Sequence, residues 1–230
     1  MPSMELYYFP GTCARVALIA LEQAGVPFST QVVRFFRGEH KQPDHRARHP
    51  LGKVPVLVVD GQPLTENMAI IGYLYALAPQ AGLMPQAGDP LVTARNWADL
   101  ALCAATLHPL VTRLRVPEII AGPEHSSAVW SRAEAALQEA FGVLETRLAG
   151  QRWMLGEAWS VVDAFAFWLW DTAVGADFDA GPFPALRAHA EAMRNWPAVQ
   201  RALATEDAAF ATFAAEGAPF SPPPSMRPVA

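Results

Sequence analysis

Cysteine is scarce in this sequence. Among 230 residues, the only two are Cys13 and Cys103, which are too few and too far apart in sequence for a disulfide framework. No Cys-x-x-Cys pair and no Cys/His set has the spacing of metal ligands, so we expect no metal site. So little cysteine is typical of a protein from a reducing compartment, and we predict a cytoplasmic location.

Charge and long apolar runs are also limited. Charged residues make up 17% of the chain against 52% hydrophobic residues, and the formal net charge is -5. Without clustered Lys and Arg, the chain is a poor binder of a phosphate backbone, and we expect no nucleic-acid partner. No apolar run reaches the length of about 18 residues that a transmembrane helix needs. The first residues also lack the basic and apolar stretches of a secretory signal, so we expect no membrane association.

The first third of the chain alternates strand-like and helix-like segments. Pro10-Gly11, Gly25 and Asp60-Gly61 are turn or stop signals between them. Thr65 is predicted to cap the second helix, whose predicted buried face is Ala69, Ile70, Tyr73, Leu74 and Leu77. The predicted order is β-α-β followed by β-β-α, with strands at 6–9, 31–33, 56–59 and from 62, and helices at 13–24 and 66–78.

Composition divides the rest of the chain. Residues 79–90 are rich in Pro, Gly and Ala, as interdomain linkers are. From Leu91 onward strand signals fade, and about five helices are expected between the Pro and Gly breaks. We therefore predict an α/β domain followed by an all-α domain, with bounds 1–80 for the first, 81–89 for the linker, 90–216 for the second and 217–230 for a Pro-rich tail.

Four stretches, in order, resemble motifs of the cytosolic glutathione S-transferase family. They are the opening 6–28, residues 38–57 (GEHK followed by HPLGKVPVL), residues 64–70 (LTENMAI) and residues 156–164 (GEAWSVVDA). The chain looks like bacterial members, and is similar to beta-class and phi/theta-like proteins. It departs from the family pattern at four positions, where Ala14 replaces Ser, His49 replaces Asn, Asn67 replaces Ser and Val162 replaces Ala.

The resemblance implies a fold and a function. The first domain is expected to be thioredoxin-like and to bind glutathione as a cosubstrate. The second is expected to be all-helical and to hold a small hydrophobic electrophile in an apolar pocket between the domains, within a homodimer. The implied reaction is attack of the glutathione thiolate on that electrophile. Alternatives on the same scaffold are a thiol transferase or peroxidase that uses Cys13, a glutathione-dependent isomerase or reductive dehalogenase, and a non-catalytic ligandin or stress adaptor.

The resemblance also assigns residues to glutathione. The Val54-Pro55 bond is expected to be cis, with Val54 offering its backbone to the cysteinyl part. Asn67 is expected to bind the γ-glutamyl carboxylate and Glu66 to face the α-amino group, at a helix N-terminus where a carboxylate is favoured. By themselves, both could be ordinary residues of a first helical turn.

A cation is expected at the glycine carboxylate of glutathione. Lys53 and Lys41 are the first candidates, and His40 is the next. A solvated loop charge is the alternative for each. His45 and His49 are interpreted as loop residues.

Catalysis requires the thiolate of glutathione, because the thiolate is the nucleophile. Cys13 at the start of the first helix is the leading candidate, and its position favours a lowered pKa. It could also form a mixed disulfide with glutathione, or be a small buried apolar residue instead. Thr12 is the runner-up as a hydroxyl donor, whereas Tyr7 and Tyr8 on the strand are disfavoured.

Candidates in the second domain are fewer. His108 resembles a histidine that faces the site from the helical domain in bacterial members, although a helix-end His is an equal alternative. Phe9, Arg113 and Trp170 are candidates for the electrophile pocket by position. Cys103, in a Leu- and Ala-rich helix, is predicted to be core.

Overall fold

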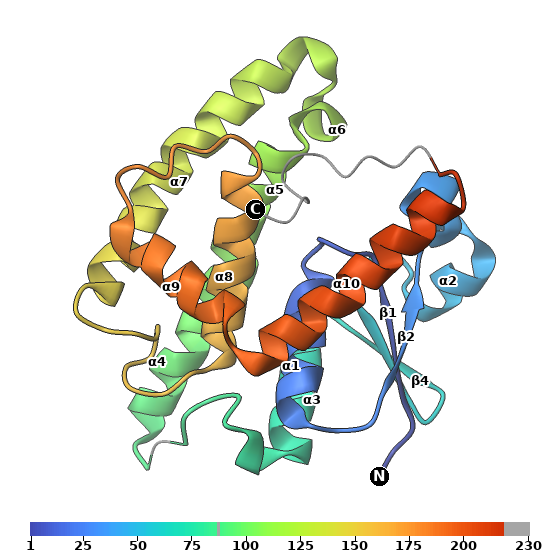
Figure 1. Cartoon of the computed structure of the whole chain (residues 1–230), viewed down its shortest axis with the longest axis horizontal. Helices are drawn as coiled ribbons and strands as arrows, with labels where there is room; N and C mark the ends of the chain where they lie inside the picture. Colours follow the sequence, from blue (N-terminus) through green and yellow to red (C-terminus); the bar gives the residue numbers. More distant parts are fainter. Residues whose placement is uncertain (87, 219–230) are drawn as a thin grey trace. The chain divides into compact units, whose positions relative to one another are not determined.

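The computed structural model describes residues 1–86 and 88–218 (Figure 1). Among these residues it forms one four-stranded sheet and a helical region. The strands are β1 (Met4–Tyr8), β2 (Ser29–Val32), β3 (Val56–Val59) and β4 (Gln62–Thr65), and the α-helices are α1 (Ala14–Ala24), α2 (Pro43–Arg48), α3 (Asn67–Leu77), α4 (Pro90–Ala101), α5 (His108–Arg115), α6 (Pro117–Ala121), α7 (Ser126–Leu148), α8 (Val161–Val174), α9 (Pro184–Arg194) and α10 (Pro197–Ala215).

The sheet is mixed, with strand order β2-β1-β3-β4. β1 lies parallel to β2, because α1 carries the chain back between them, and antiparallel to β3, which a tight turn joins to β4. Leu6 is opposite Thr30 on one side and Leu57 on the other. These strands confirm the predicted β-α-β and β-β-α order, and β3 has the predicted bounds.

Alternation along β1 sends neighbouring side chains to opposite faces of the sheet. Leu6 and Tyr8 are buried on the face where the Tyr8 hydroxyl donates to the carbonyl of Thr205 in α10, at 3.3 Å. Tyr7 points the other way, toward α2, where the Arg48 guanidinium lies 4.5 Å from its ring centroid. Helices therefore cover both faces of the sheet.

The helix starts differ from prediction at two places. α1 begins at Ala14, with Cys13 as its N-cap. α3 begins at Asn67, and its N-cap is Glu66 rather than Thr65, with a left-handed φ of 69° and no side-chain cap. The predicted buried face of α3 was also partly wrong. Its buried residues are Asn67, Ile70, Ile71 and Leu74, whereas Ala69 is exposed.

The chain folds as two compact units. The first comprises residues 1–83 together with the described part of the chain from Trp196 onward, and the second comprises residues 84–195. The break between Leu83 and Met84 lies inside the predicted linker. α10, which falls within the predicted range 90–216, packs along α1 in the first unit (Figure 1). Of the predicted tail, residues 219–230 lie outside the described residues.

The second unit is helical and has an aromatic core around α8, of which twelve of fourteen residues are buried. Phe141 of α7 packs edge-on against Phe178 and Phe183, with ring centroids 5.2 and 6.1 Å away. α8 begins at the expected motif: the Ser160 hydroxyl bonds Asp163, and the Asp163 carboxylate accepts from the backbone N–H of Ser160 at 2.8 Å.

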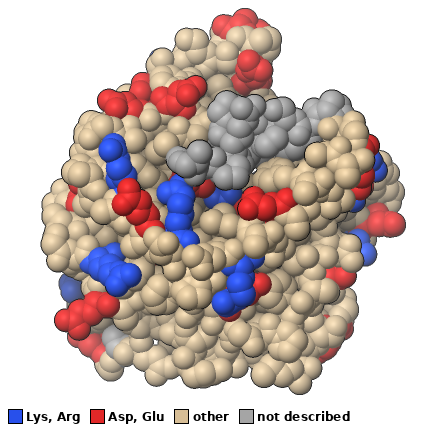
Figure 2. Space-filling view, viewed as in Figure 1, with Lys and Arg blue, Asp and Glu red and all other residues tan. Residues whose placement is uncertain are grey.

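Two further properties concern membranes and charge. Within residues 1–86 and 88–218, no helix combines the length and apolarity that crossing a bilayer requires. On the face shown in Figure 2, Lys and Arg side chains are scattered among Asp and Glu rather than joined in one basic stretch.

The close approach of Gly52 to the His40 backbone can be tested by substitution. It has a φ of +63°, and a Cβ at this position would lie 2.4 Å from the backbone oxygen of His40. Gly25 has nearly the same φ, +64°, but open space around it. Gly25→Ala should therefore cost about 1 kcal/mol for the left-handed conformation alone, and Gly52→Ala about 2 kcal/mol more because the backbone must move. Urea unfolding of both variants measures the difference, and equal losses would contradict the close contact.

Candidate functional site

The turn between β1 and α1 fixes Thr12. Its hydroxyl donates to the carbonyl of Phe9 at 2.6 Å, and its backbone N–H bonds the same carbonyl at 3.3 Å. The hydroxyl oxygen also accepts from the backbone N–H of Ala14 at 3.4 Å. Because the Thr12 proton is directed at Phe9, Thr12 must break a short hydrogen bond before it can donate to a ligand.

Cys13 follows at the N-cap of α1 and is partly exposed. Its thiol lies 3.8 Å from the carbonyl oxygen of Val54, toward which it donates. The Val54-Pro55 bond is cis, as predicted. The fold thus brings two candidate elements together, one from the start of α1 and one from the approach to β3.

Asn67 joins the same place from the first turn of α3. Its side-chain nitrogen donates to the carbonyl of Cys13 at 3.0 Å, and only 7% of the residue is exposed. Its side-chain oxygen is buried without a hydrogen-bond partner among the described residues. Glu66 beside it is exposed. The first N–H groups of a helix have no partner within that helix, so an acceptor is favoured here.

The three cation candidates differ in character. Lys41 and Lys53 are exposed, so both ammonium groups are accessible to an anion. The His40 ring lies against Phe35, at 4.5 Å between centroids, and its Nδ1 is buried without a hydrogen-bond partner in the described part of the chain. Burial and, next, the charge of Lys41 lower the pKa of His40, so it is neutral at pH 7. The two lysines remain the candidate cations.

The interpretation as a loop residue was wrong for His45, whereas His49 follows the last residue of α2 and lies outside the helix, as predicted. His45 lies in α2, is buried, and contacts the carbonyl of Lys53 through Nε2 at 2.9 Å. His49 is the C-cap of α2, and its Nδ1 accepts from the backbone N–H of Leu51 at 3.2 Å. Both rings hold backbone of the segment that leads to Val54.

The tyrosines of β1 remain disfavoured as thiol activators. Burial, with the nearby Glu206 carboxylate, raises the pKa of Tyr8 to about 12, and its hydroxyl is turned to α10. Burial likewise raises the pKa of Tyr7, whose hydroxyl donates to Glu5 at 2.8 Å. Neither hydroxyl is directed at Cys13.

Two of the pocket candidates are core residues, which corrects the prediction for them. Phe9 stacks on Phe35 and Phe213, at 4.9 and 5.7 Å between centroids. Trp170 is buried and packs against Phe141 at 5.8 Å. Arg113 is exposed and lines an open hollow of about 270 Å³ in the second unit, together with Leu110, Ile120, Val129, Arg132 and Ala133.

Two further residues discussed from the sequence, His108 and Cys103, lie in the second unit. His108 is the first residue of α5, and its ring lies edge-on to Trp168 at 4.9 Å. Cys103 is 1% exposed within the π-helical segment Leu102–Leu107, which confirms it as core. Across residues 1–86 and 88–218, no three His, Cys, Asp or Glu side chains converge to hold a metal ion.

Comparison with known proteins identifies the family. Residues 2–76 match the N-terminal domain of glutathione S-transferases, and residues 102–197 match their C-terminal domain. A glutathione S-transferase of Xanthomonas campestris is 32% identical over 218 residues, which are 88% of this chain and 98% of the relative. This chain belongs to the glutathione S-transferase family.

Two other comparisons bear on this glutathione S-transferase. A solved Sulfitobacter glutathione transferase homologue with bound glutathione superposes with a TM-score of 0.79 and 27% identity, over 91% of this chain and 99% of the other. A maleylacetoacetate isomerase of Pseudomonas aeruginosa is 40% identical over 111 residues, which are 46% of this chain and 51% of the relative. The transferase fold is therefore shared along nearly the whole chain.

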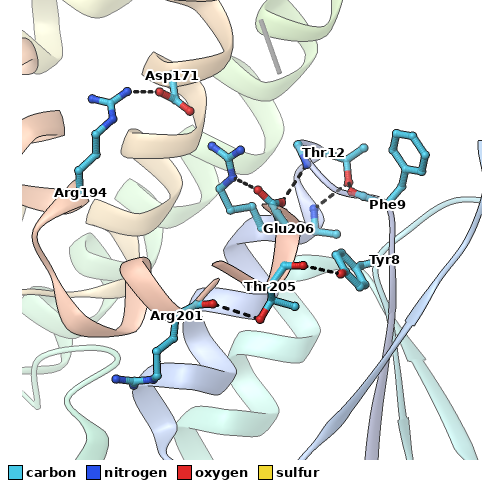
Figure 3. Close-up of polar contacts among 11 residues, drawn as sticks. Tyr8, Phe9, Thr12, Asp171, Arg194, Arg201, Thr205 and Glu206 are labelled. Atoms are coloured by element: carbon cyan, nitrogen blue, oxygen red, sulfur yellow. Dashed lines mark hydrogen bonds and ion pairs between the residues drawn. The ribbon is translucent and has the colours of Figure 1, made fainter. Parts of the chain in front are cut away.

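Sequence reasoning missed one residue of this transferase that reaches the site. Glu206 of α10 is 1% exposed, and its carboxylate accepts from the backbone N–H of Gly11 at 2.8 Å and from Arg15 Nε at 2.7 Å (Figure 3). A signal was present, because Glu206 falls in the apolar stripe of its helix, whose other buried members are Ala198, Val199, Ala202, Ala209 and Phe213.

The two cysteines should differ in reactivity. Burial raises the pKa of Cys103 to about 12, so its thiol stays protonated at neutral pH, whereas Cys13 is partly exposed at a helix N-terminus. Iodoacetamide at pH 7.5 should therefore alkylate Cys13 and spare Cys103 in the folded protein, as read by peptide mass spectrometry. Unfolding in urea, as a control, should expose both. Preferential labelling of Cys103 would contradict the assignment.

Proposed function

We propose that this glutathione transferase binds glutathione in the first unit and directs its thiolate at a small hydrophobic electrophile. The observation that carries the proposal is the convergence of Cys13, Val54 and Asn67. They come from three separate segments, yet the Cys13 thiol donates a hydrogen bond to the Val54 carbonyl, and the Cys13 carbonyl accepts one from the Asn67 side chain. Homologues with bound glutathione support the same ligand here.

In the proposed complex, each part of glutathione has a matching group. The cysteinyl backbone pairs with Val54, next to the cis bond to Pro55. The γ-glutamyl carboxylate lies at the N-terminus of α3, against Asn67, with its α-amino group toward Glu66. Lys53 and Lys41, both exposed, supply charge for the glycine carboxylate, and neutral His40 supplies at most a hydrogen bond.

The N-terminus of α1 then activates the thiol of the bound glutathione. Its positive end stabilises a nearby thiolate and so lowers the pKa of a thiol placed there. The thiolate sulfur forms a bond to the electrophilic carbon, and the electron pair passes to the leaving group or to the acceptor of an addition. Cys13 lies beside this sulfur as a positioning contact. With a mixed disulfide of glutathione as substrate, the Cys13 thiolate attacks the glutathione sulfur, the substrate S–S bond breaks and the substrate thiolate leaves, and a second glutathione then displaces Cys13 to give glutathione disulfide. Thr12 is the second candidate donor.

Further proposals concern the finer calls. His108 is a candidate contact to the electrophile from the helical unit. The electrophile site as a whole, assembly as a homodimer and a cytoplasmic location are likewise proposals, and they rest on resemblance to the family.

A second candidate function is glutathione-dependent isomerisation. It is favoured by the 40% identity over 111 residues to the Pseudomonas isomerase. The glutathione thiolate would add to a conjugated double bond, allow rotation, and leave again, so that glutathione is regenerated. A substrate panel that contains a chlorodinitrobenzene, a disulfide and a cis-dienoate separates conjugation, thiol exchange and isomerisation.

Asn67 should affect glutathione binding. Asn67→Ala removes the hydrogen bond to the Cys13 carbonyl and the polar group proposed for the γ-glutamyl carboxylate. We expect glutathione affinity to fall by about tenfold or more, the value of roughly 1.4 kcal/mol. Titration calorimetry measures this, with Met68→Ala, one residue along the same helix, as the control. Equal affinity in both variants would remove Asn67 from the site.

Cys13 and Thr12 can be separated by paired variants. Cys13→Ala should abolish thiol exchange with a disulfide, because no protein thiol remains at the site to form the mixed disulfide. Thr12→Val should leave that exchange intact and lower conjugation only if the hydroxyl serves the thiolate. Rates with both substrates are measured side by side. Full thiol exchange in Cys13→Ala would exclude the mixed-disulfide route.

A further inference from the structure

The contact between α10 and the first turn of α1 is more than helix packing. Glu206 is buried, forms an ion pair with Arg15, and reaches two groups that flank Cys13 in sequence. One is the backbone N–H of Gly11, two residues before Cys13, and the other is the guanidinium of Arg15, two residues after it. Chain separation between the partners exceeds 190 residues.

We propose that Glu206 is a positioning residue of the transferase, which holds the Pro10–Cys13 turn in the conformation that presents the Cys13 sulfur and the α1 N-terminus to glutathione. The proposal rests on the proposed function, because it assumes that the α1 N-terminus serves the thiol. Glu206 itself touches no substrate in this account, and it acts through Gly11.

The geometry explains why Gly11 needs such an acceptor. Gly11 is buried and has a φ of 74°, a left-handed conformation that turns the chain from β1 into α1. A buried backbone N–H without an acceptor costs about 1 to 3 kcal/mol. The Glu206 carboxylate supplies this acceptor. It therefore favours the left-handed conformation of Gly11 over conformations in which the Gly11 N–H no longer points at Glu206.

Charge balance explains why the acceptor is a carboxylate. Arg15 is 5% exposed, and a buried guanidinium needs an opposite charge. Glu206 pairs with Arg15 through Oε2 and accepts from the Gly11 N–H through Oε1. One side chain thus balances the charge of Arg15 in α1 and fixes the turn before that helix. Two roles of one carboxylate can be separated by removing the charged pair together.

Two double variants isolate the hydrogen bond to Gly11. Glu206→Gln with Arg15→Met removes both charges but keeps a side-chain oxygen for Gly11. Glu206→Leu with Arg15→Met removes both charges and also the acceptor. Paired replacement of buried charges by apolar residues is often neutral for stability, but the leucine variant also removes the acceptor of the Gly11 N–H and should be less stable than the glutamine variant by about 1 to 3 kcal/mol. Asp207→Asn, an exposed neighbour on α10, is the surface control.

The readouts are thermal unfolding, kcat and KM for glutathione conjugation, and hydrogen exchange of the Gly11 amide. We expect the glutamine variant to stay close to wild type in kcat. The leucine variant should lose about tenfold or more in kcat, because a misplaced reacting group is costly, and its Gly11 amide should exchange faster. Both variants are assayed well below their unfolding temperatures, so the loss in kcat does not come from unfolded protein, and a purely structural role would leave kcat unchanged there.

Equal kcat and equal Gly11 exchange in the two double variants would overturn the proposal. If the leucine variant does not fold, Glu206→Asp is compared instead, since its shorter side chain keeps the charge but withdraws it from Gly11; unchanged exchange and kcat there overturn the proposal as well. Should wild type show no turnover, the proposed function fails, while Gly11 exchange still decides whether Glu206 holds the turn.

Discussion

The hydrogen bond from the Asn67 side chain to the Cys13 carbonyl is the interaction on which the candidate site depends. It joins the N-termini of α1 and α3, although Cys13 and Asn67 are 54 residues apart. In the sequence, α1 precedes the β3–β4 hairpin and α3 follows it. Both helices thereby direct their positive ends to one place. An anionic ligand with two charged groups, a thiolate and a carboxylate, is suited to that arrangement.

Other contacts hold the parts around this bond. His45 of α2 and His49, the C-cap that follows it, hydrogen-bond backbone of the segment before Val54, and Glu206 of α10 hydrogen-bonds the turn before Cys13. The site is therefore fixed by side chains that point away from any ligand.

Local pattern predicted much of the first unit. The apolar run Val56–Val59 and its Asp60-Gly61 turn give β3 and the hairpin, and Gly25 ends α1 in a left-handed conformation, as a stop signal should. The cap of α3 could not be predicted in this way, because the left-handed φ of Glu66 depends on the direction in which the chain leaves β4 and enters the helix. The packing of α10 on α1 is likewise set by contacts distant in sequence.

The candidate site was predicted less evenly. Resemblance to the family placed Cys13, Val54 and Asn67 together, and the structure confirms that they are neighbours. Composition gave no sign that His45 belongs to a helix, since Pro and charged residues surround it, and position alone could not tell that Phe9 and Trp170 are core. Glu206 was detectable only as a charge within an apolar stripe, which requires knowing the helix register first.

The pKa of the thiol of bound glutathione shows most directly whether the α1 N-terminus activates glutathione. Thiolate absorbance is titrated between pH 5 and 9 with saturating glutathione and with the free tripeptide as reference. We predict that the bound thiol ionises at least about one pH unit below the ordinary thiol value of about 8.5, because the α1 N-terminus favours the charged form. A bound thiol that titrates like free glutathione would contradict this role of the α1 N-terminus.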